Sequence, residues 1–349
     1  MTHRSTMARL VSAAGLTILT ACAAPEARPP EVAPPAARPP LGSTIDARLQ
    51  VIADEELDRT LAEWKASAGT VLILDPASGE ILASAGRVDG AASSVALQRA
   101  YVTGSTLKTI LVAAALDEGV VTPTDSFDCA QGQRAYGDHL LRDASPRGAL
   151  TLAEMLAVST NVGFSHVADR LGGDRVGRWF RRFHFGQAPG VLPASIDLGT
   201  LAGARAAIGG VMTATPLQVA AAYAAIANDG AYVAPTFGKR TGAPQREQLV
   251  RPETARAVKG MLDAVVNGPL GTGAAARVAG SRVIGKTGTA IWRESGGGEG
   301  RYASFVGIVP AAAPRFVILV GVEGPRDDGG GHTVAAPAFA RVASRALGG

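Results

Sequence analysis

Three short groups of polar residues have the types and spacing that acyl transfer needs. In the first, Ser105-Thr106-Leu107-Lys108, the serine and the lysine lie three residues apart at the start of an apolar helical pattern, so they share one helix face. Free backbone N–H groups and the helix dipole at that end favour a developing negative charge. Because a serine becomes a nucleophile beside a base, and a desolvated lysine can be neutral, the pair is a candidate nucleophile and base. Taken alone, the motif is weak and is more typical of an N-cap serine with a surface lysine.

Two later motifs supply further hydroxyl, amide and ammonium groups. Ser159-Thr160-Asn161 directly follows a helical pattern, where a polar turn is the ordinary interpretation. Lys286-Thr287-Gly288-Thr289-Ala290 lies within a strand pattern that begins at Val283. Glycine weakens a strand, and the close approach of a ligand's backbone is one reason for a glycine there. We therefore expect Gly288 to lie beside a bound ligand.

The three motifs together, in this order and on helix, loop and strand, match the active-site set of penicillin-binding proteins and serine β-lactamases. The chain also resembles a penicillin-binding transpeptidase domain over most of residues 69–322, notably in 69–83, 215–230 and 303–307. The SxN form and the KTGTA sequence are most similar to monofunctional class B transpeptidases. This resemblance implies a penicillin-binding/β-lactamase-like fold and a D,D-transpeptidase or D,D-carboxypeptidase that acts on the D-Ala-D-Ala ends of peptidoglycan stem peptides.

The resemblance also implies the catalytic roles. Ser105 would attack the carbonyl carbon and become the acyl-enzyme, Lys108 would accept its proton, and Ser159 would relay a proton to the leaving nitrogen. The backbone N–H groups of Ser105 and Thr289 would form the oxyanion hole, which is typically worth about 3–4 kcal/mol per donor. No cofactor and no metal is implied, and β-lactam antibiotics are expected as covalent inhibitors.

The remaining motif residues are expected to bind substrate. By resemblance, Asn161 would hold an amide of the donor peptide. Lys286 would supply the positive charge that keeps the base lysine neutral, and it would bind the substrate carboxylate together with Thr287, Gly288 and Thr289.

Two other functions stay open on the sequence. A serine β-lactamase needs an efficient way to hydrolyse the acyl-enzyme, but the Glu-x-x-Leu-Asn segment of class A enzymes is absent between Phe164 and Thr215. Asn161 also departs from the SxV motif of class D enzymes. The third possibility is a non-catalytic penicillin-binding or scaffold lipoprotein, although penicillin sensors carry a transmembrane signalling module that a lipid anchor does not replace.

The N-terminus has the pattern of an export signal. Arg4 and Arg9 precede a short apolar stretch, and Leu19-Thr20-Ala21-Cys22 resembles the lipobox of bacterial lipoproteins, with an ordinary secretory signal as the alternative. Lipid on Cys22 would anchor the protein to the periplasmic side of the cell envelope, and Ala23 favours the outer membrane over the inner one. The expected parts are a signal peptide (1–21), lipidated Cys22 with a Pro-rich linker (22–43), and the transpeptidase-like domain (44–349).

The resemblance is incomplete in one respect. Class B enzymes usually carry a large N-terminal pedestal domain and a membrane anchor helix, and the residues between the linker and Ser105 are too few for a pedestal or for a glycosyltransferase. A role as the main septal or elongation synthase is therefore not expected.

Composition is consistent with one folded domain. The chain has 349 residues, 47% of them hydrophobic and 18% charged, which excludes a disordered or collagen-like protein. The formal net charge of +4 comes without a basic cluster interleaved with aromatic residues, so no nucleic-acid partner is expected. Cys129 has no partner in the mature chain and is expected to be an idle thiol, while the scattered histidines His139, His166, His184 and His332 lack ligand spacing.

The elements that must position the motifs follow from apolar periodicity. An amphipathic helix is predicted over 43–68, broken near Ala53, followed by a hairpin of strands at 70–75 and 80–84. Further helices are predicted at 105–118, 151–158, 216–228 and 335–347, and three strands at 282–292, 302–310 and 316–322. Short connections between the late strands favour antiparallel pairing. The fold class is therefore α/β of the α+β type, an antiparallel sheet flanked by helices with a helical subdomain.

Overall fold

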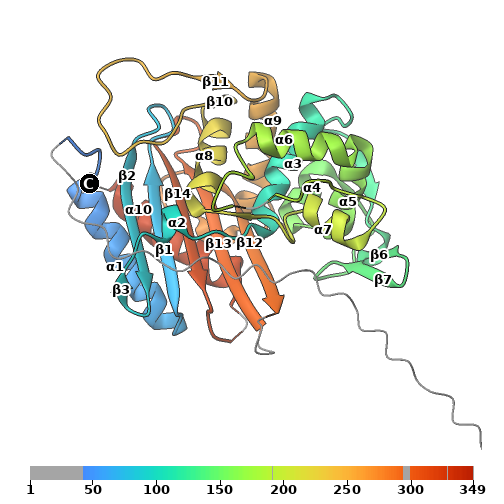
Figure 1. Ribbon diagram of the computed structural model, residues 1–349, viewed down its shortest axis with the longest axis horizontal. Coiled ribbons are helices and arrows are strands. Elements are labelled where there is room, and N and C mark those ends of the chain that lie inside the picture. The colour runs from blue at the N-terminus through green and yellow to red at the C-terminus, as the bar shows by residue number, and fades with distance from the viewer. Residues whose placement is uncertain (1–41, 191, 294–298, 328, 349) are drawn as a thin grey trace, which may run out of the picture.

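The fold is built around a six-stranded antiparallel sheet, seen at the centre of Figure 1. The computed structural model describes residues 42–190, 192–293, 299–327 and 329–348, so the expected signal peptide, Cys22 and almost all of the expected linker lie outside the described residues. The strand order is β12–β13–β14–β1–β2–β3, so the predicted early hairpin and the three predicted late strands form one sheet. The bounds are β1 (Ala68–Leu74), β2 (Ile81–Val88), β3 (Ala91–Ala92), β12 (Ile284–Arg293), β13 (Glu299–Val309) and β14 (Phe316–Glu323).

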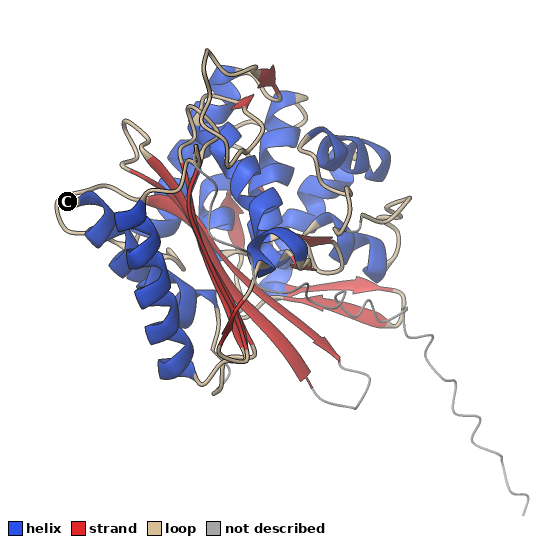
Figure 2. Cartoon of the chain, turned by 60° about the vertical axis from the view of Figure 1, so that its left-hand side comes forward, coloured by secondary structure: helices blue, strands red, loops and turns tan. Residues whose placement is uncertain are grey.

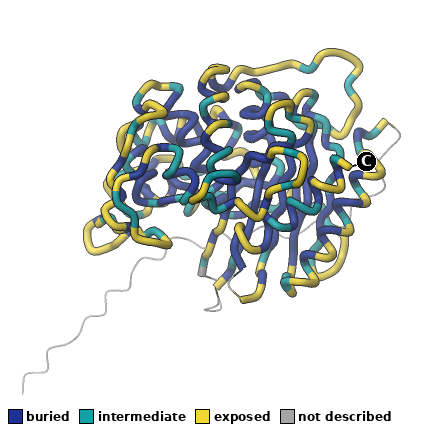
Figure 3. Tube along the Cα trace, turned by 180° about the vertical axis from the view of Figure 1, so that it is seen from behind, coloured by how far each residue is buried: buried dark blue, intermediate teal, exposed yellow. Residues whose placement is uncertain are grey.

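Strand β1 lies inside the sheet, with β14 on one side and β2 on the other. Its side chains alternate between two apolar cores, because successive residues of a strand point to opposite faces. Val71 and Ile73 belong to one core, and Leu72 and Leu74 belong to the other. Helices cover both faces, as Figure 2 shows, and the strands between them are largely buried along the trace in Figure 3.

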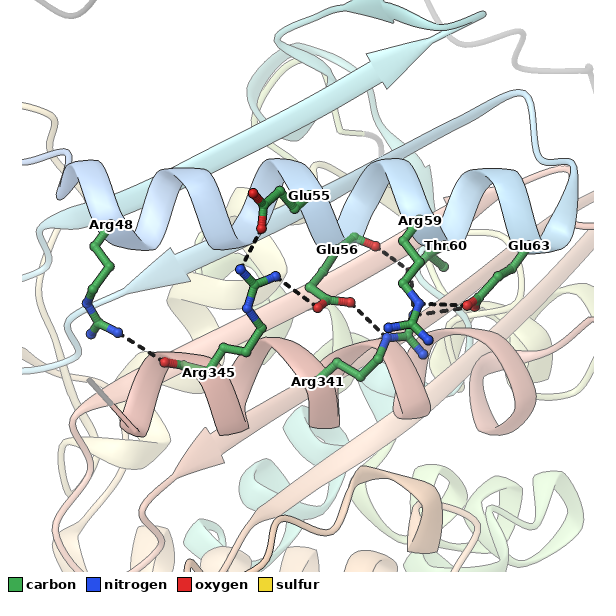
Figure 4. A network of polar contacts seen from close by, with 8 residues as sticks. All are labelled: Arg48, Glu55, Glu56, Arg59, Thr60, Glu63, Arg341 and Arg345. Atoms are coloured by element: carbon green, nitrogen blue, oxygen red, sulfur yellow. Dashed lines mark hydrogen bonds and ion pairs between the residues drawn. The ribbon is translucent and has the colours of Figure 1, made fainter.

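The first and last helices, α1 (Ala47–Trp64) and α10 (Ala336–Leu347), pack together on one face of the sheet. Buried Glu56 of α1 accepts hydrogen bonds from Arg341 at 2.8 Å and from Arg345 at 3.0 Å, both on α10 (Figure 4). The predicted break near Ala53 is wrong. Ala53 is fully buried, and because alanine is the strongest helix former the chain stays helical through it.

The other face of the sheet carries the second core and the helical subdomain, whose helices α4 to α7 lie to the right of the sheet in Figure 1. The helices are α2 (Val95–Gln98), α3 (Lys108–Asp117), α4 (Leu152–Val158), α5 (Asn161–Leu171), α6 (Gly173–Arg182), α7 (Leu201–Ala207), α8 (Pro216–Ala227) and α9 (Pro252–Asn267). Four short strand pairs are β4 (Tyr101–Val102) with β9 (Thr213–Ala214), β5 (Ser126–Asp128) with β8 (Ala149–Thr151), β6 (Gln133–Tyr136) with β7 (His139–Arg142), and β10 (Ala231–Tyr232) with β11 (Glu247–Gln248). Among the described helices, none combines the length and the hydropathy that crossing a bilayer requires.

Candidate active site

The first motif lies where a 3₁₀ turn, η1 (Gly104–Leu107), leads into α3, so the predicted helix at 105–118 begins as a tighter turn. Gly104 has a φ of 57°, and a Cβ added to it would lie 2.9 Å from the carbonyl oxygen of Thr289 on β12. Only glycine permits this approach, which holds Ser105 against the strand. Lys108 is fully buried on α3, and its Nζ donates a hydrogen bond to Ser105 Oγ at 3.1 Å. The three-residue spacing therefore brings the amine to the hydroxyl as predicted.

The second motif occupies the bend between α4 and α5. Ser159 ends α4 in the left-handed conformation with a φ of 62°, and Thr160 caps the start of α5. The bend turns two groups toward Lys108, whose Nζ donates to the carbonyl oxygen of Ser159 at 2.6 Å and to Asn161 Oδ1 at 2.8 Å. Asn161 Nδ2 donates to the carbonyl oxygen of Arg142 on β7 at 2.7 Å. Both ends of this carboxamide contact the protein itself, and one N–H hydrogen of Nδ2 is left for another acceptor.

The third motif contributes Lys286 from β12. This side chain is also fully buried, and its Nζ donates hydrogen bonds to Ser159 Oγ at 2.9 Å and to the carbonyl oxygen of Thr287 at 3.1 Å. Ser159 Oγ lies 3.4 Å from the Nζ of Lys108 as well, so this hydroxyl sits between two lysine amines. A continuous row of polar atoms thus runs from Ser105 Oγ through Lys108 Nζ and Ser159 Oγ to Lys286 Nζ. Three segments far apart in the sequence together form a path for a proton.

Burial destabilises the protonated form of both lysine amines. It lowers the pKa of Lys108 to about 7, and the charge of Asp143 opposes this shift. Burial, and then the charge of Lys108, lower the pKa of Lys286 well below its usual range. Both amines therefore bind a proton less readily than a lysine in water does. That Lys286 supplies the positive charge that keeps Lys108 neutral stays a prediction.

The two threonines of the third motif differ in their surroundings. Thr287 is buried, and its hydroxyl lies 3.0 Å from the hydroxyl of Thr272, which also donates to a carbonyl oxygen of α4. Thr289 is exposed, and its Oγ1 accepts a hydrogen bond from the N–H of Gly331 at 3.0 Å. Of the two hydroxyls expected to bind a substrate carboxylate, Thr289 has the accessible one.

Gly288 is required by the packing of the protein itself. A Cβ at this position would lie 2.4 Å from Ser304 Oγ on β13 and 2.9 Å from Thr106 Cγ2 on η1. Those distances are shorter than any ordinary contact, so a side chain would force β12 away from η1. The glycine allows the third motif to approach the first, which differs from the ligand contact that the sequence suggested.

Asp143, which follows β7, is a site residue that the motifs do not reveal. Its carboxylate accepts hydrogen bonds from the Thr160 hydroxyl and from the backbone N–H groups of Asn161 and Val162. An anionic acceptor at the first N–H groups of a helix stabilises that end. Asp143 therefore fixes the start of α5, and with it the second motif, while its charge raises the pKa of Lys108. No local pattern could have identified it, because the link to α5 exists only in the folded chain.

The structure also shows the surroundings of Cys129 and His184, for which the sequence predicted no catalytic or metal-binding role. Cys129 is buried and unpaired, and burial raises the pKa of its thiol, which confirms that it lies in the interior as an unreactive group. The ring of His184 packs against Tyr232, and its Nε2 lies 3.1 Å from Glu247, so this histidine ties two surface segments together.

Comparisons with known proteins identify the family. The family model described as the penicillin binding protein transpeptidase domain matches residues 69–344. A probable peptidoglycan D,D-transpeptidase, PbpC of Pseudomonas aeruginosa, is 31% identical over 328 residues, which cover 87% of this chain and 58% of that protein. Peptidoglycan D,D-transpeptidase FtsI of Escherichia coli is 30% identical over 329 residues, which cover 86% of this chain and 55% of that protein.

The structural comparison points the same way. The TP domain of penicillin-binding protein 3 from Burkholderia pseudomallei has a TM-score of 0.79 at 30% identity, over 88% of this chain and 96% of that domain. This chain spans a little over half the length of the curated relatives and nearly all of the solved domain. With the sheet, the helical subdomain and the three motifs in place, the chain belongs to the family of penicillin-binding protein transpeptidase domains.

Proposed function

We propose that this chain is a serine acyltransferase acting on the D-Ala-D-Ala ends of peptidoglycan stem peptides, as a D,D-transpeptidase or a D,D-carboxypeptidase. The observation that carries the proposal is the row of contacting atoms Ser105 Oγ, Lys108 Nζ, Ser159 Oγ and Lys286 Nζ. Such a row connects a nucleophile, a base and a second proton carrier. Relatives named as peptidoglycan D,D-transpeptidases support the substrate class.

In the acylation step, Ser105 Oγ attacks the carbonyl carbon of the terminal peptide bond. Its proton passes to the Nζ of Lys108, which contacts it at 3.1 Å. The tetrahedral oxyanion is held by the backbone N–H groups of Ser105 and Thr289, whose segments η1 and β12 are in close contact at Gly104. When the C–N bond breaks, the leaving amine of D-Ala takes a proton through Ser159 Oγ. An acceptor amine or water then attacks the ester and regenerates the free serine.

The acyl donor also adjusts the charge of the lysine pair. Thr289 and Lys286 bind the terminal carboxylate, and the second N–H hydrogen of Asn161 Nδ2 donates to an amide carbonyl of the donor peptide. A carboxylate beside Lys286 raises the pKa of that amine, because an opposite charge favours the protonated form. The charge on Lys286 in turn disfavours a proton on Lys108, so that Lys108 acts as the neutral base.

The environment of Asp143, whose carboxylate contacts the second motif, does not support the alternative of a β-lactamase. A β-lactamase needs a base that activates water against the acyl-enzyme. The carboxylate of Asp143 is engaged by the Thr160 hydroxyl and by two backbone N–H groups at the start of α5. It is therefore committed to the helix start and is not free to activate water.

A chromogenic cephalosporin provides the test. The protein in known amount is mixed with nitrocefin, and the mass of the intact protein is followed over time. We expect one burst of hydrolysis equal to the protein concentration and a lasting adduct, because an opened β-lactam keeps its leaving group tethered in the site. Sustained turnover at several per second would make the protein a β-lactamase. Absence of any adduct would favour a non-catalytic binding protein.

We also propose that the protein is attached by lipid at Cys22 to the periplasmic side of the cell envelope, with the outer membrane favoured. The support is the sequence alone: the lipobox-like Leu19-to-Cys22 segment, the proline-rich linker and Ala23. Peptidoglycan, the material that the named relatives act on, is part of the envelope. Cys22→Ser should move the protein from the membrane fraction to the soluble fraction. Unchanged membrane retention would contradict lipid anchoring.

A further inference from the structure

The glycine-rich loop that precedes α10, residues 329–331, packs against the third motif. The N–H of Gly331 donates to Thr289 Oγ1 at 3.0 Å. A Cβ on Gly331 would lie 2.4 Å from the carbonyl oxygen of Ser304 and 2.5 Å from that of Gly288, so only glycine fits. Because Gly329 and Gly330 also lack side chains, the first side chain that this loop offers beside β12 is that of His332.

His332 lies next to the exposed hydroxyl of Thr289. The position that a Cβ on Gly330 would take is 3.1 Å from Thr289 Oγ1 and 3.3 Å from His332 Nδ1, so both atoms border the same small gap. The histidine is exposed and stands in a single π-helical turn, η4 (Gly331–Ala335), a backbone form that is frequent at functional sites. The N–H of Gly330 donates to Thr333 Oγ1 at 3.0 Å and fixes the start of this turn.

The Thr289 hydroxyl and the His332 ring, which border this gap, can both donate a hydrogen bond. Thr289 Oγ1 accepts the N–H of Gly331, so its own hydrogen is left to donate. Within the part of the chain that the structure describes, no group accepts that hydrogen and none hydrogen-bonds to the His332 ring. Two convergent donors suit an acceptor with more than one lone pair, which a carboxylate provides.

We propose that His332 is a specificity-determining residue that donates a hydrogen bond to the carboxylate of the acyl donor, next to Thr289. This inference rests on the proposed function, because it requires a donor whose terminal carboxylate binds at Thr289. It assigns a recognition role to a side chain outside the three motifs. A ligand without the negative charge should therefore gain nothing from His332.

The test compares benzylpenicillin with its methyl ester, which carries the same reactive ring without the carboxylate charge. Second-order acylation rate constants are measured from intact protein mass for wild type, His332→Ala, His332→Gln and His139→Ala. We expect His332→Ala to lower the rate with the acid about tenfold, the ordinary effect of losing one hydrogen bond to a charged group, and to leave the ester rate nearly unchanged. His332→Gln should keep most of the acid preference, because its amide still donates.

His139 is the matched control, since it is also an exposed histidine but lies on β7 rather than beside Thr289. His139→Ala should leave both rates unchanged. Equal losses with acid and ester in His332→Ala would show a merely structural role and overturn the inference, and so would an unchanged acid rate. A wild-type protein that neither ligand acylates would overturn the proposed function itself.

Discussion

Replacing Asp143 with asparagine should shift the pH dependence of acylation toward lower pH. Asparagine keeps a side-chain oxygen that can accept the N–H groups of α5, but it removes the negative charge that raises the pKa of Lys108. An anion stabilises the protonated form of a nearby amine, so its removal lowers the pKa of that amine. The neutral, proton-accepting form of Lys108 then predominates at a lower pH than in the wild type.

The pKa of Lys108 sets the size of the effect. With the pKa of Lys108 held at about 7 by burial, roughly one tenth of the amine is neutral at pH 6, so acylation there should run at about one tenth of its plateau. Because the fraction cannot exceed one, Asp143→Asn can raise the relative rate at pH 6 by at most about tenfold. The increase in relative acylation rate at pH 6 therefore lies between none and about tenfold. It is read from the shape of the pH profile and not from the absolute rate.

The assay is the second-order rate constant for acylation by a fluorescent penicillin between pH 5 and 9, with each variant scaled to its own plateau. This constant reports ionisations of the free protein. Asp46→Asn is the matched control, because Asp46 also caps a helix, accepting the N–H of Leu49 at 2.9 Å, but it does so on α1, which packs on the opposite face of the sheet. The control should leave the profile in place. A profile of Asp143→Asn that coincides with the wild type, or that moves to higher pH, refutes the reasoning.

Three further outcomes can be measured. Ser105→Ala should give no penicillin adduct by intact mass and should lose no more than about 1 kcal/mol of unfolding free energy, since one hydrogen bond disappears; a remaining adduct would place the nucleophile elsewhere. Gly288→Ala should destabilise the fold by about 1–3 kcal/mol in urea unfolding, because its Cβ would lie 2.4 Å from Ser304 Oγ; wild-type stability would contradict this packing. Glu56→Gln should cost about 2 kcal/mol at pH 7. Burial raises the pKa of Glu56, but the two α10 arginines lower it more, so its contribution is present at neutral pH and is lost as the pH falls; the variant should therefore approach the wild type in acid, and a constant difference would argue against the ion pairs.

The sequence predicted the fold wherever a pattern is local. Apolar runs bounded by turn residues indicated the strands, and helical spacing put the amine of Lys108 at the hydroxyl of Ser105, where the structure has 3.1 Å. The break expected near Ala53 was wrong, because alanine is the strongest helix former and Ala53 is buried in the core. The start of the helix at Ser105 became a 3₁₀ turn because Gly104 lies against β12, a contact between distant segments.

Of the site, only the residues of the three motifs could be predicted from the sequence. Ser159 and Lys286 were identified by type and order, but the position of one hydroxyl between two buried amines is a property of the folded chain. Asp143 and His332 went unrecognised because each acts through a tertiary neighbour, the start of α5 in one case and Thr289 in the other. The burial that lowers the pKa of Lys286 could not be predicted for a related reason. Burial depends on every segment that packs around the amine.

The order of strands in the sheet has a consequence for how the protein comes into being. Strand β1 is made early, yet its neighbour β14 comes near the end of the chain, with Leu72 paired to Leu319. During vectorial synthesis or passage through a membrane, a nascent chain therefore carries β1 without its partner until almost all residues have emerged. β1 is buried on both faces in the finished sheet, so the waiting strand exposes apolar side chains on both sides and is prone to aggregation. The closing contact spans nearly the whole domain, and non-local pairing of this kind slows folding.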